Sequence, residues 1–226
     1  RMYMSDTDKN QSFGEFAPLQ PVKLLADKPT FGEQKYRAVM GVTSSVESFL
    51  FLEDNLRSAF RCGLNYITEP FDQDKEIIGH PMMKIAFRLV EKGNLAKEND
   101  LDFFVALSDY DAEKNQAFQF CNGWIRSSLR AESECPYDFQ GLPWHENKIG
   151  SNQYLEEGEK YSILLDLVPS MYRIKKGHQL LVTIVNSQAR TYYNGRAAFE
   201  ENPDITCPLI ELLLSECYLD IPNIYE

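Results

Sequence analysis

Residues 161–187 read YSILLDLVPSMYRIKKGHQLLVTIVNS, and this stretch decides the fold class. In its first run, 161–168, apolar and polar side chains alternate, and this period of two predicts a half-buried strand. The second run, 179–186, is apolar on both faces, as expected near the centre of a sandwich or under a partner. Pro169 and Gly177 lie between the runs and favour turns, because proline cannot donate to a sheet and glycine tolerates tight turns. The stretch therefore predicts an antiparallel β-sandwich and carries no catalytic pattern.

Short apolar runs separated by turn signals continue along the chain, a pattern typical of an all-β sandwich. One short helix is expected over 205–214, where Pro208 suits an early helical position. Residues 48–53 fit a capped helix or a strand followed by a turn, and the β-rich run FLFL at 49–52 favours the strand. Besides 161–168 and 179–186, the expected strands are 36–42, 64–68, 76–78, 82–90, 101–108, 117–129 and 215–221.

Length and composition fit one domain with an extended N-terminal segment. The chain has 226 residues, 43% of them hydrophobic, which is enough for one sizeable core. Residues 1–35 are polar and carry several prolines, so we expect a linker or tail that packs on a neighbouring domain, with the sandwich over 36–226. The chain opens at Arg1 rather than at a native-looking start, as a fragment would.

Charge and cysteine content exclude several classes of function. A net charge of −11 opposes nucleic-acid binding and anionic membrane surfaces, since both are contacted by Lys and Arg. The five cysteines are odd in number and lack the close pairs of a zinc site, so we expect free thiols in a reducing cytoplasm and no metal or other cofactor. No apolar run is long enough to span a bilayer.

Several blocks, in order, resemble the C-terminal domain of the X-Pro dipeptidyl-peptidase and cocaine-esterase-like serine hydrolases. The most specific is LEEGEKYSILLDLVPSMYRIKKGHQLLVTI, which is similar to the family pattern L-x-x-G-x-x-Y-x-x-x-x-D-L-x-P followed by G-H-x-L. Together the blocks cover about residues 36–186. The other blocks are FLFLEDNLRS (49–58), YITEPFDQDKEIIGHP (66–81), DLDFFVALSDYD (100–111) and GWIRSSLR (123–130).

The resemblance implies a jelly-roll β-sandwich, similar to galactose-binding domains, that follows an α/β-hydrolase domain in the same polypeptide. In such enzymes the catalytic Ser, Asp and His lie in that upstream domain. The chain contains no G-x-S-x-G, the turn that exposes a nucleophilic serine, so no catalytic residue is carried over. The segments 132–152 and 203–214 depart from the family pattern and leave the subfamily open, dipeptidyl-peptidase or esterase.

Two histidines stand in informative places. His178 follows Gly177 in the turn before a core strand, where a ring nitrogen bound to backbone would fix the loop. His145 lies beside Trp144 in a loop that also holds Tyr137 and Phe139. We expect Tyr137, Trp144 and His145 to contact the neighbouring domain or to line the mouth of its active site, although simple packing is the other interpretation.

Two arginines are candidates for structural ion pairs. Arg126 and Arg130 are four residues apart in an expected strand, so they would share a face. Pairing with Asp102 or Asp166 would let them cross the sheet, since a partly buried arginine needs a partner.

Asp109, Asp111 and Glu113 have the spacing that begins a calcium loop. Lys114 and Phe120 stand where an EF-hand needs glycine and a bidentate glutamate, so a solvated hairpin turn is expected.

Three functions remain for the whole chain. The first is an accessory domain that packs on a hydrolase, shapes substrate access and exposes an apolar patch when alone, through which it would self-associate. The second is an autonomous carbohydrate-binding jelly roll, because Trp124, Trp144 and many tyrosines offer surfaces for sugar stacking. The third is a structural interaction domain with no hydrolase upstream.

Overall fold

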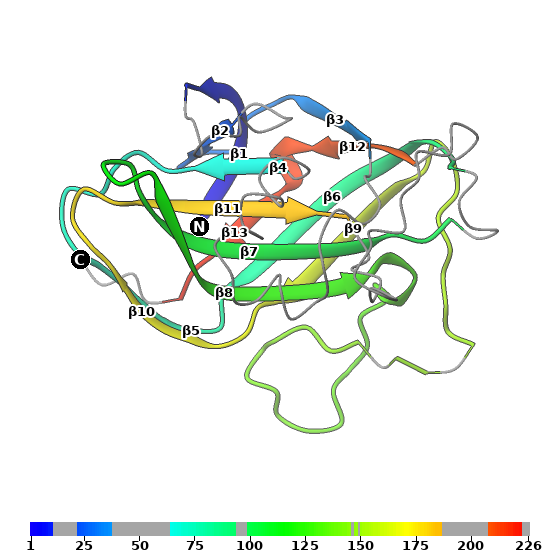
Figure 1. Ribbon diagram of the computed structural model, residues 1–226. Helices are drawn as coiled ribbons and strands as arrows, with labels where there is room; N and C mark the ends of the chain where they lie inside the picture. The colour runs from blue at the N-terminus through cyan, green and yellow to red at the C-terminus, as the bar shows by residue number, and fades with distance from the viewer. Residues whose placement is uncertain are drawn as a thin grey trace, which may run out of the picture.

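The computed structural model describes residues 1–10, 22–37, 64–93, 99–145, 147–148, 150–186 and 208–222. Nearly all the regular structure in these ranges is β, which confirms the fold class (Figure 1). Two 3-10 turns, η1 (Ser127–Leu129) and η2 (Leu214–Glu216), follow strands. The strands are β1 (Met2–Lys9), β2 (Val22–Ala26), β3 (Glu33–Arg37), β4 (Leu64–Ile67), β5 (Lys75–Gly79), β6 (Met82–Glu91), β7 (Asp102–Asp111), β8 (Gln116–Arg126), β9 (Lys160–Asp166), β10 (Ser170–Ile174), β11 (Gln179–Val185), β12 (Leu209–Leu213) and β13 (Tyr218–Asp220).

The two runs that decide the fold lie in different parts of one sheet. β9 pairs antiparallel with β6 and alternates as expected, with Ile163 and Leu165 buried. β11 is buried at every residue and lies between β4 and β7, which confirms a strand at the centre of the sandwich. The chain between them forms β10, a strand that the sequence did not predict, and β10 pairs with β5 in a small second sheet.

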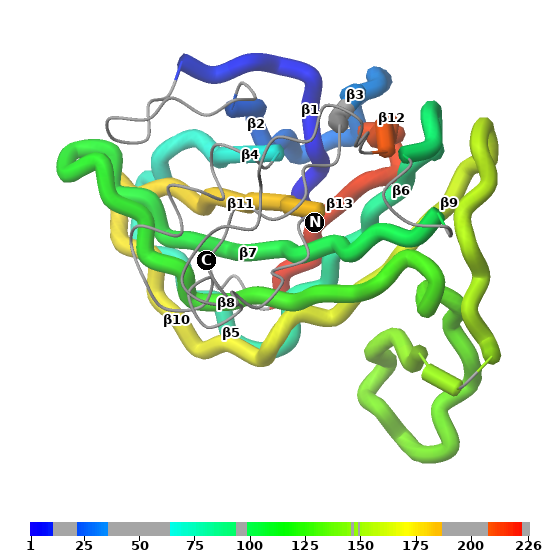
Figure 2. Tube along the Cα trace, turned by 45° about the vertical axis from the view of Figure 1, so that its right-hand side comes forward, coloured from blue at the N-terminus to red at the C-terminus, as the bar shows by residue number. Residues whose placement is uncertain are grey.

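The main sheet bends back on itself to enclose the core. Its order is β3-β12-β6-β13-β1-β2-β4-β11-β7-β8, and β9 pairs with the other edge of β6. In Figures 1 and 2, β7, β8 and β11 lie in front of β6 and β9. Side chains from both layers meet between them, as where the ring centroids of Phe87 (β6) and Phe103 (β7) lie 4.9 Å apart.

The N-terminal segment belongs to the sheet, so the expectation of a linker over residues 1–35 is wrong for its strands. β1 pairs with β13 and β2, and β2 runs parallel to β4. Met4 is fully buried in the main core. Arg1 also binds Asp220 at 2.8 Å and lies 4.0 Å above the Tyr218 ring. The polar N-terminal segment is therefore part of the sheet because its strands pair with β13 and β4, which lie further along the chain.

The helix expected over 205–214 is a strand in its described part. β12 lies between β3 and β6 and is buried at four of its five residues. Glu211 is buried, with its carboxylate 3.0 Å from Arg88 of β6 and 4.0 Å from Lys35 of β3. Neighbours on both sides thus satisfy the backbone of β12, and this tertiary pairing overrides a weak helical pattern.

Other boundaries shift by a few residues. The strand expected over 117–129 ends at Arg126 and continues as η1, and that expected over 215–221 is η2 followed by β13. The strand expected over 36–42 is described only as far as Arg37, at the end of β3. The candidate at 48–53 lies outside the described residues.

A close approach between β8 and the chain around the end of β9 positions the candidate site. A Cβ on Gly123 would lie 2.6 Å from Leu167 Cδ2 and 2.8 Å from Leu165 Cδ1. The backbone oxygen of Asp166 would be only 2.9 Å away. Only glycine fits at this contact, which brings Trp124 next to Asp166 across the two elements.

Candidate functional site: an aromatic pocket beside β8

A pocket of about 430 Å³ lies where the end of β8, the end of β9 and the loop 131–148 meet. Three aromatic side chains, one guanidinium, one imidazole and one carboxylate line it, so it combines apolar walls with a few polar groups, as small-molecule sites do. The lining residues are Trp124, Ile125, Arg126, Leu129, Phe139, Pro143, Trp144, His145, Asn147, Leu165 and Asp166.

The aromatic walls come from two elements. Phe139 and Trp144 lie in the loop with ring centroids 5.3 Å apart and planes at 81°. Tyr137 meets both rings edge-on, at 6.0 and 5.4 Å. Trp124 projects from β8 with 64% of its surface exposed, stacked on Phe104 at 6.2 Å. The aromatic residues of the loop therefore form one cluster, and Trp124 belongs to the surface rather than to the core.

His145 fastens the loop to the sandwich. Its Nε2 lies 3.0 Å from the backbone oxygen of Leu164 in β9, and its Nδ1 lies 3.3 Å from that of Ala131. A neutral imidazole has one N–H and can donate to one of these carbonyls at a time, whereas an imidazolium could donate to both. In either state the ring is committed to backbone contacts.

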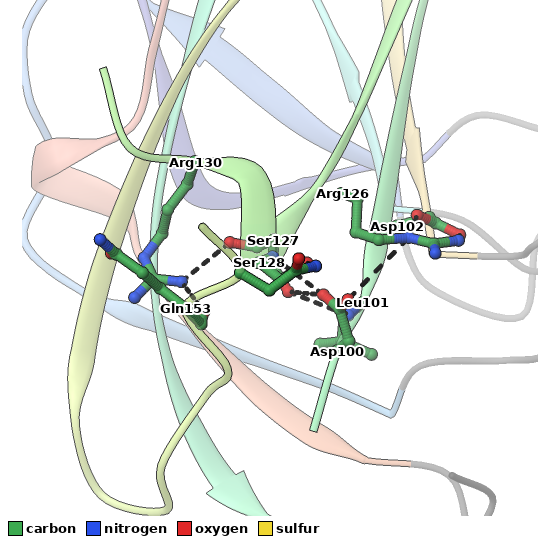
Figure 3. Close-up of polar contacts among 9 residues, drawn as sticks. Asp100, Leu101, Asp102, Arg126, Ser127, Ser128, Arg130 and Gln153 are labelled. Carbon is green, nitrogen blue, oxygen red and sulfur yellow. Dashed lines mark hydrogen bonds and ion pairs between the residues drawn. The ribbon is translucent and has the colours of Figure 1, made fainter. Parts of the chain in front are cut away.

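A network of short polar contacts holds the turn that ends β8 (Figure 3). Arg126 donates two hydrogen bonds to the buried Asp102 carboxylate, at 2.8 and 3.1 Å. This fork geometry raises the pKa of the Arg126 guanidinium. Asp100 accepts hydrogen bonds from the Ser127 hydroxyl at 2.7 Å and the Ser128 N–H at 2.9 Å. These hydrogen bonds hold the turn that places Arg126 and Leu129 at the pocket.

Arg130 lies outside the pocket lining and away from Arg126. Because η1 replaces the end of the expected strand, the prediction that the two arginines share a face by period two is wrong. The Arg130 guanidinium donates to the backbone oxygens of Ser127, at 2.8 Å, and Gln153. It also lies 4.5 Å above the Tyr161 ring, and burial lowers its pKa. Arg130 therefore ties the returning chain to η1.

Asp166 contributes the acidic group of the pocket. It is the last residue of β9 and pairs across the sheet with Met82. Within the ranges that the structure describes, its carboxylate has no hydrogen bond or ion pair. The sequence had offered Asp166 as a partner for the arginines, but Arg126 takes Asp102 instead.

Residues 36–196 match the family described as the X-Pro dipeptidyl-peptidase C-terminal non-catalytic domain. The chain belongs to this family. The match covers more than half of the chain, and it confirms the resemblance found in the sequence.

The proteins to which this chain is similar are longer chains. A protein described as a serine esterase in Mycobacterium bovis is 27% identical over 127 residues, which are 56% of this chain and 19% of that protein. A CocE/NonD family hydrolase from Staphylococcus aureus has a TM-score of 0.57 at 16% identity over 88% of this chain and 34% of its own. An alpha-amino acid ester hydrolase has a TM-score of 0.59 at 15% identity over 98% of this chain and 35% of its own. The X-Pro dipeptidyl-peptidase C-terminal domain thus spans about a fifth of the curated relatives and a third of the solved chains.

His178 binds carboxylates rather than the backbone that the sequence suggested. Its Nδ1 lies 2.8 Å from Asp109 and its Nε2 lies 3.6 Å from Asp111. Tyr172 donates to the other Asp109 oxygen at 3.0 Å, and burial together with this carboxylate raises the pKa of Tyr172 to about 12. Gly177, with a φ of 84°, forms the turn before β11. The cluster connects β10, β7 and β11.

Within the described residues, no Ser, Thr or Cys side chain hydrogen-bonds to a histidine, and no group of three His, Cys, Asp or Glu side chains is placed to hold a metal ion. Asp111 accepts a hydrogen bond from Lys114 Nζ at 2.7 Å, which lowers the pKa of Asp111, and it also accepts hydrogen bonds from the backbone N–H groups of Lys114 and Glu113. In the same ranges, no helix has the length and apolar character to cross a membrane.

The sequence singled out Trp144, His145, Arg126 and Asp166, and the structure brings all four to one pocket. Tyr137 lies beside the pocket, against Phe139 and Trp144. Sequence reasoning missed the anchoring role of Asp100 and Ser127. The available signal was that Asp100 is a polar residue just before β7 and Ser127 one just after β8. No sequence pattern indicates that two residues 27 positions apart are in contact.

Proposed function

We propose that this chain is the accessory β-sandwich of a serine hydrolase whose α/β catalytic domain lies upstream in the same polypeptide, and that it packs on that domain and shapes substrate access. The observation that carries the proposal is the family match over residues 36–196, to a domain described as non-catalytic. The solved relatives support it, because the fold of this chain fills only 34–37% of their length.

The loop around Tyr137, Trp144 and His145 is the contact surface that we assign to the catalytic domain. It protrudes from the sandwich (Figure 2) and carries Tyr137 with 57% of its surface exposed. His145 holds it to β9 and the ring cluster stiffens it. A rigid, aromatic projection can border an active-site entrance at little cost in ordering entropy, because few side chains must be immobilised on contact. In the absence of its neighbour, the chain would associate through its exposed apolar side chains, as size-exclusion chromatography would reveal.

The test begins with the open reading frame. We expect G-x-S-x-G, then Asp and His, before the codon for Arg1. The isolated chain should hydrolyse neither X-Pro-nitroanilides nor short-chain esters. In the parent enzyme, Tyr137→Ala should change KM for bulky substrates and leave the kcat for the smallest ester unchanged. Substitution of the exposed Phe31, which lies in another part of the sandwich, provides the control. Enzyme-like turnover by the isolated chain would refute the proposal.

A cytoplasmic location is part of the proposal. Cys121, Cys135 and Cys217 are free thiols in the described part of the chain, as in proteins of reducing compartments. Fractionation of the source cells would test this.

The carbohydrate-binding alternative has the concave aromatic surface that it requires, but the polar groups of the pocket are largely engaged. Arg126 is bound to Asp102, and both ring nitrogens of His145 face carbonyl oxygens. Sugar recognition needs several polar groups aimed at hydroxyls. A glycan array without hits would remove this alternative.

A further inference from the structure

The aromatic pocket has walls suited to positive charge. Phe139 and Trp144 stand nearly perpendicular, 5.3 Å apart, so they form adjoining walls rather than one flat platform. Trp124 lines the same pocket from β8. The faces of aromatic rings are negative and attract cations, and indole does so most strongly. Such an arrangement resembles the aromatic cages that recognise alkylated ammonium groups.

The charges around the pocket also favour a positively charged ligand. Arg126 is the cation in the lining, but the Asp102 carboxylate already offsets it at 2.8 Å. Asp166 also lines the pocket, and in the described ranges its carboxylate lacks a hydrogen-bonding or ionic partner. A cation held in the pocket would be attracted both by this half-buried carboxylate and by the faces of the aromatic rings.

We propose that this pocket binds an alkylammonium group, with Asp166 as its counter-ion and Trp124, Phe139 and Trp144 as its walls. The volume of about 430 Å³ lies in the range of small-molecule sites and accepts a group the size of choline. An anionic ligand would meet Asp166. A sugar would find Arg126 and His145 engaged elsewhere. The inference goes beyond the accessory role.

The chain provides its own reporter for this site. It contains two tryptophans, and both line the pocket. Tryptophan fluorescence of the 226-residue chain is therefore recorded during titration with choline and with 3,3-dimethylbutan-1-ol, its neutral carbon analogue. We expect a saturable change with choline and at least roughly tenfold weaker binding of the alcohol, because only choline gains from Asp166 and the ring faces.

Two substitutions separate the contributions of charge and ring. Asp166→Asn keeps the shape and removes the charge, and Phe139→Leu removes a ring while keeping an apolar side chain. Each should weaken choline binding by roughly tenfold. Glu157→Gln removes the same charge from an exposed turn and should leave binding unchanged. Circular dichroism and thermal melting establish that each variant is folded.

Three outcomes would overturn the proposal. The first is an equal response to choline and to its neutral analogue. The second is unchanged choline affinity in folded Asp166→Asn. The third is a fluorescence change with galactose or xylose but none with choline, which would assign the pocket to sugars. None of these outcomes bears on the hydrolase assignment, which rests on the upstream sequence and on kinetics.

Discussion

Asp102 is 5% exposed, and a carboxylate so deeply buried persists in a sandwich only if it is paired. The two hydrogen bonds from Arg126 meet that need, and they also fix the turn that supports the pocket. The sequence placed Arg126 in a strand and offered Asp102 or Asp166 as its partner, because a partly buried arginine needs one. It could not choose between Asp102 and Asp166, since that choice depends on register.

Arg126→Gln should lower the free energy of unfolding by about 1–3 kcal/mol, because it leaves the Asp102 carboxylate buried without its counter-ion. Arg173→Gln is the matched control. Both side chains of the Arg173–Glu76 pair are exposed, so the change should be clearly smaller than that for Arg126→Gln. Urea denaturation at pH 7 measures both, and equal losses would contradict the role given to burial.

Cys121 and Cys217 should resist alkylation in the folded protein. Burial raises the pKa of each thiol to about 12, so at pH 8 the reactive thiolate is scarce and shielded. Cys135 is partly exposed and should react. Iodoacetamide labelling followed by peptide mass spectrometry, with and without urea, checks this. Because these folded-state values exceed the ordinary value of 9.0, stability should fall as pH rises from about 9 to 12.

In several elements, pairing with neighbouring strands decides the secondary structure more than the intrinsic helix or strand propensity of the segment does. β12 carries a run of leucines in helical spacing, yet β3 and β6 bind it from both sides. β10 contains Arg173 and an exposed Met171, so its alternation was too weak to predict. β9 and β11 were predictable from their sequences. Burial of one face gives β9 alternating apolar and polar residues, and burial of both faces gives β11 a nearly continuous apolar run.

Arg88→Gln should destabilise the chain by about 1–3 kcal/mol, since it leaves Glu211 without its close partner at 3.0 Å. Lys35→Gln is the control, because Lys35 lies 4.0 Å from the same carboxylate and is 65% exposed. Its cost should be below about 0.5 kcal/mol. Thermal unfolding compares the two, and a larger effect at Lys35 would mean that β3 rather than β6 anchors Glu211.

Gly123→Ala should cost about 1–3 kcal/mol, because the added methyl group overlaps Leu167 and Leu165. Leu167→Ala removes the nearest of these contacts. The double variant should therefore be more stable than the sum of the two single losses predicts. Additive losses in a double-mutant cycle would show that Leu167 does not contribute to the overlap and would leave Leu165 and the backbone oxygen of Asp166 as its cause.

The molecule as a whole is a bent sheet closed by its N-terminal strands. The sequence could not predict this closure, because MYMSDTDK carries little apolar periodicity and one of its two partners, β13, lies near the other end of the sequence. The pocket escaped prediction for a similar reason. Trp144 and His145 were recognisable as unusual loop residues, but the path of the loop depends on backbone contacts such as that between His145 and Leu164.

Deletion of residues 1–30 should abolish cooperative unfolding or solubility, because it removes β1 and β2 from the interior of the strand order and uncovers the core around Met4. A linker would be dispensable. Deletion of residues 1 and 2 alone is the milder control. Calorimetry or urea titration of both variants would decide, and a stable, folded 31–226 fragment would contradict the structure.

The antiparallel pairing of β1 with β13 has a mechanical consequence. Met2 lies opposite Leu219, so the backbone at Arg1 and that at Asp220 lie side by side at one end of the strand pair. Tension applied between these two residues would break the hydrogen bonds of the pair one after another from that end, instead of shearing them all together. We therefore expect β1 and β13 to separate under low force, starting with the loss of the Arg1–Asp220 contact.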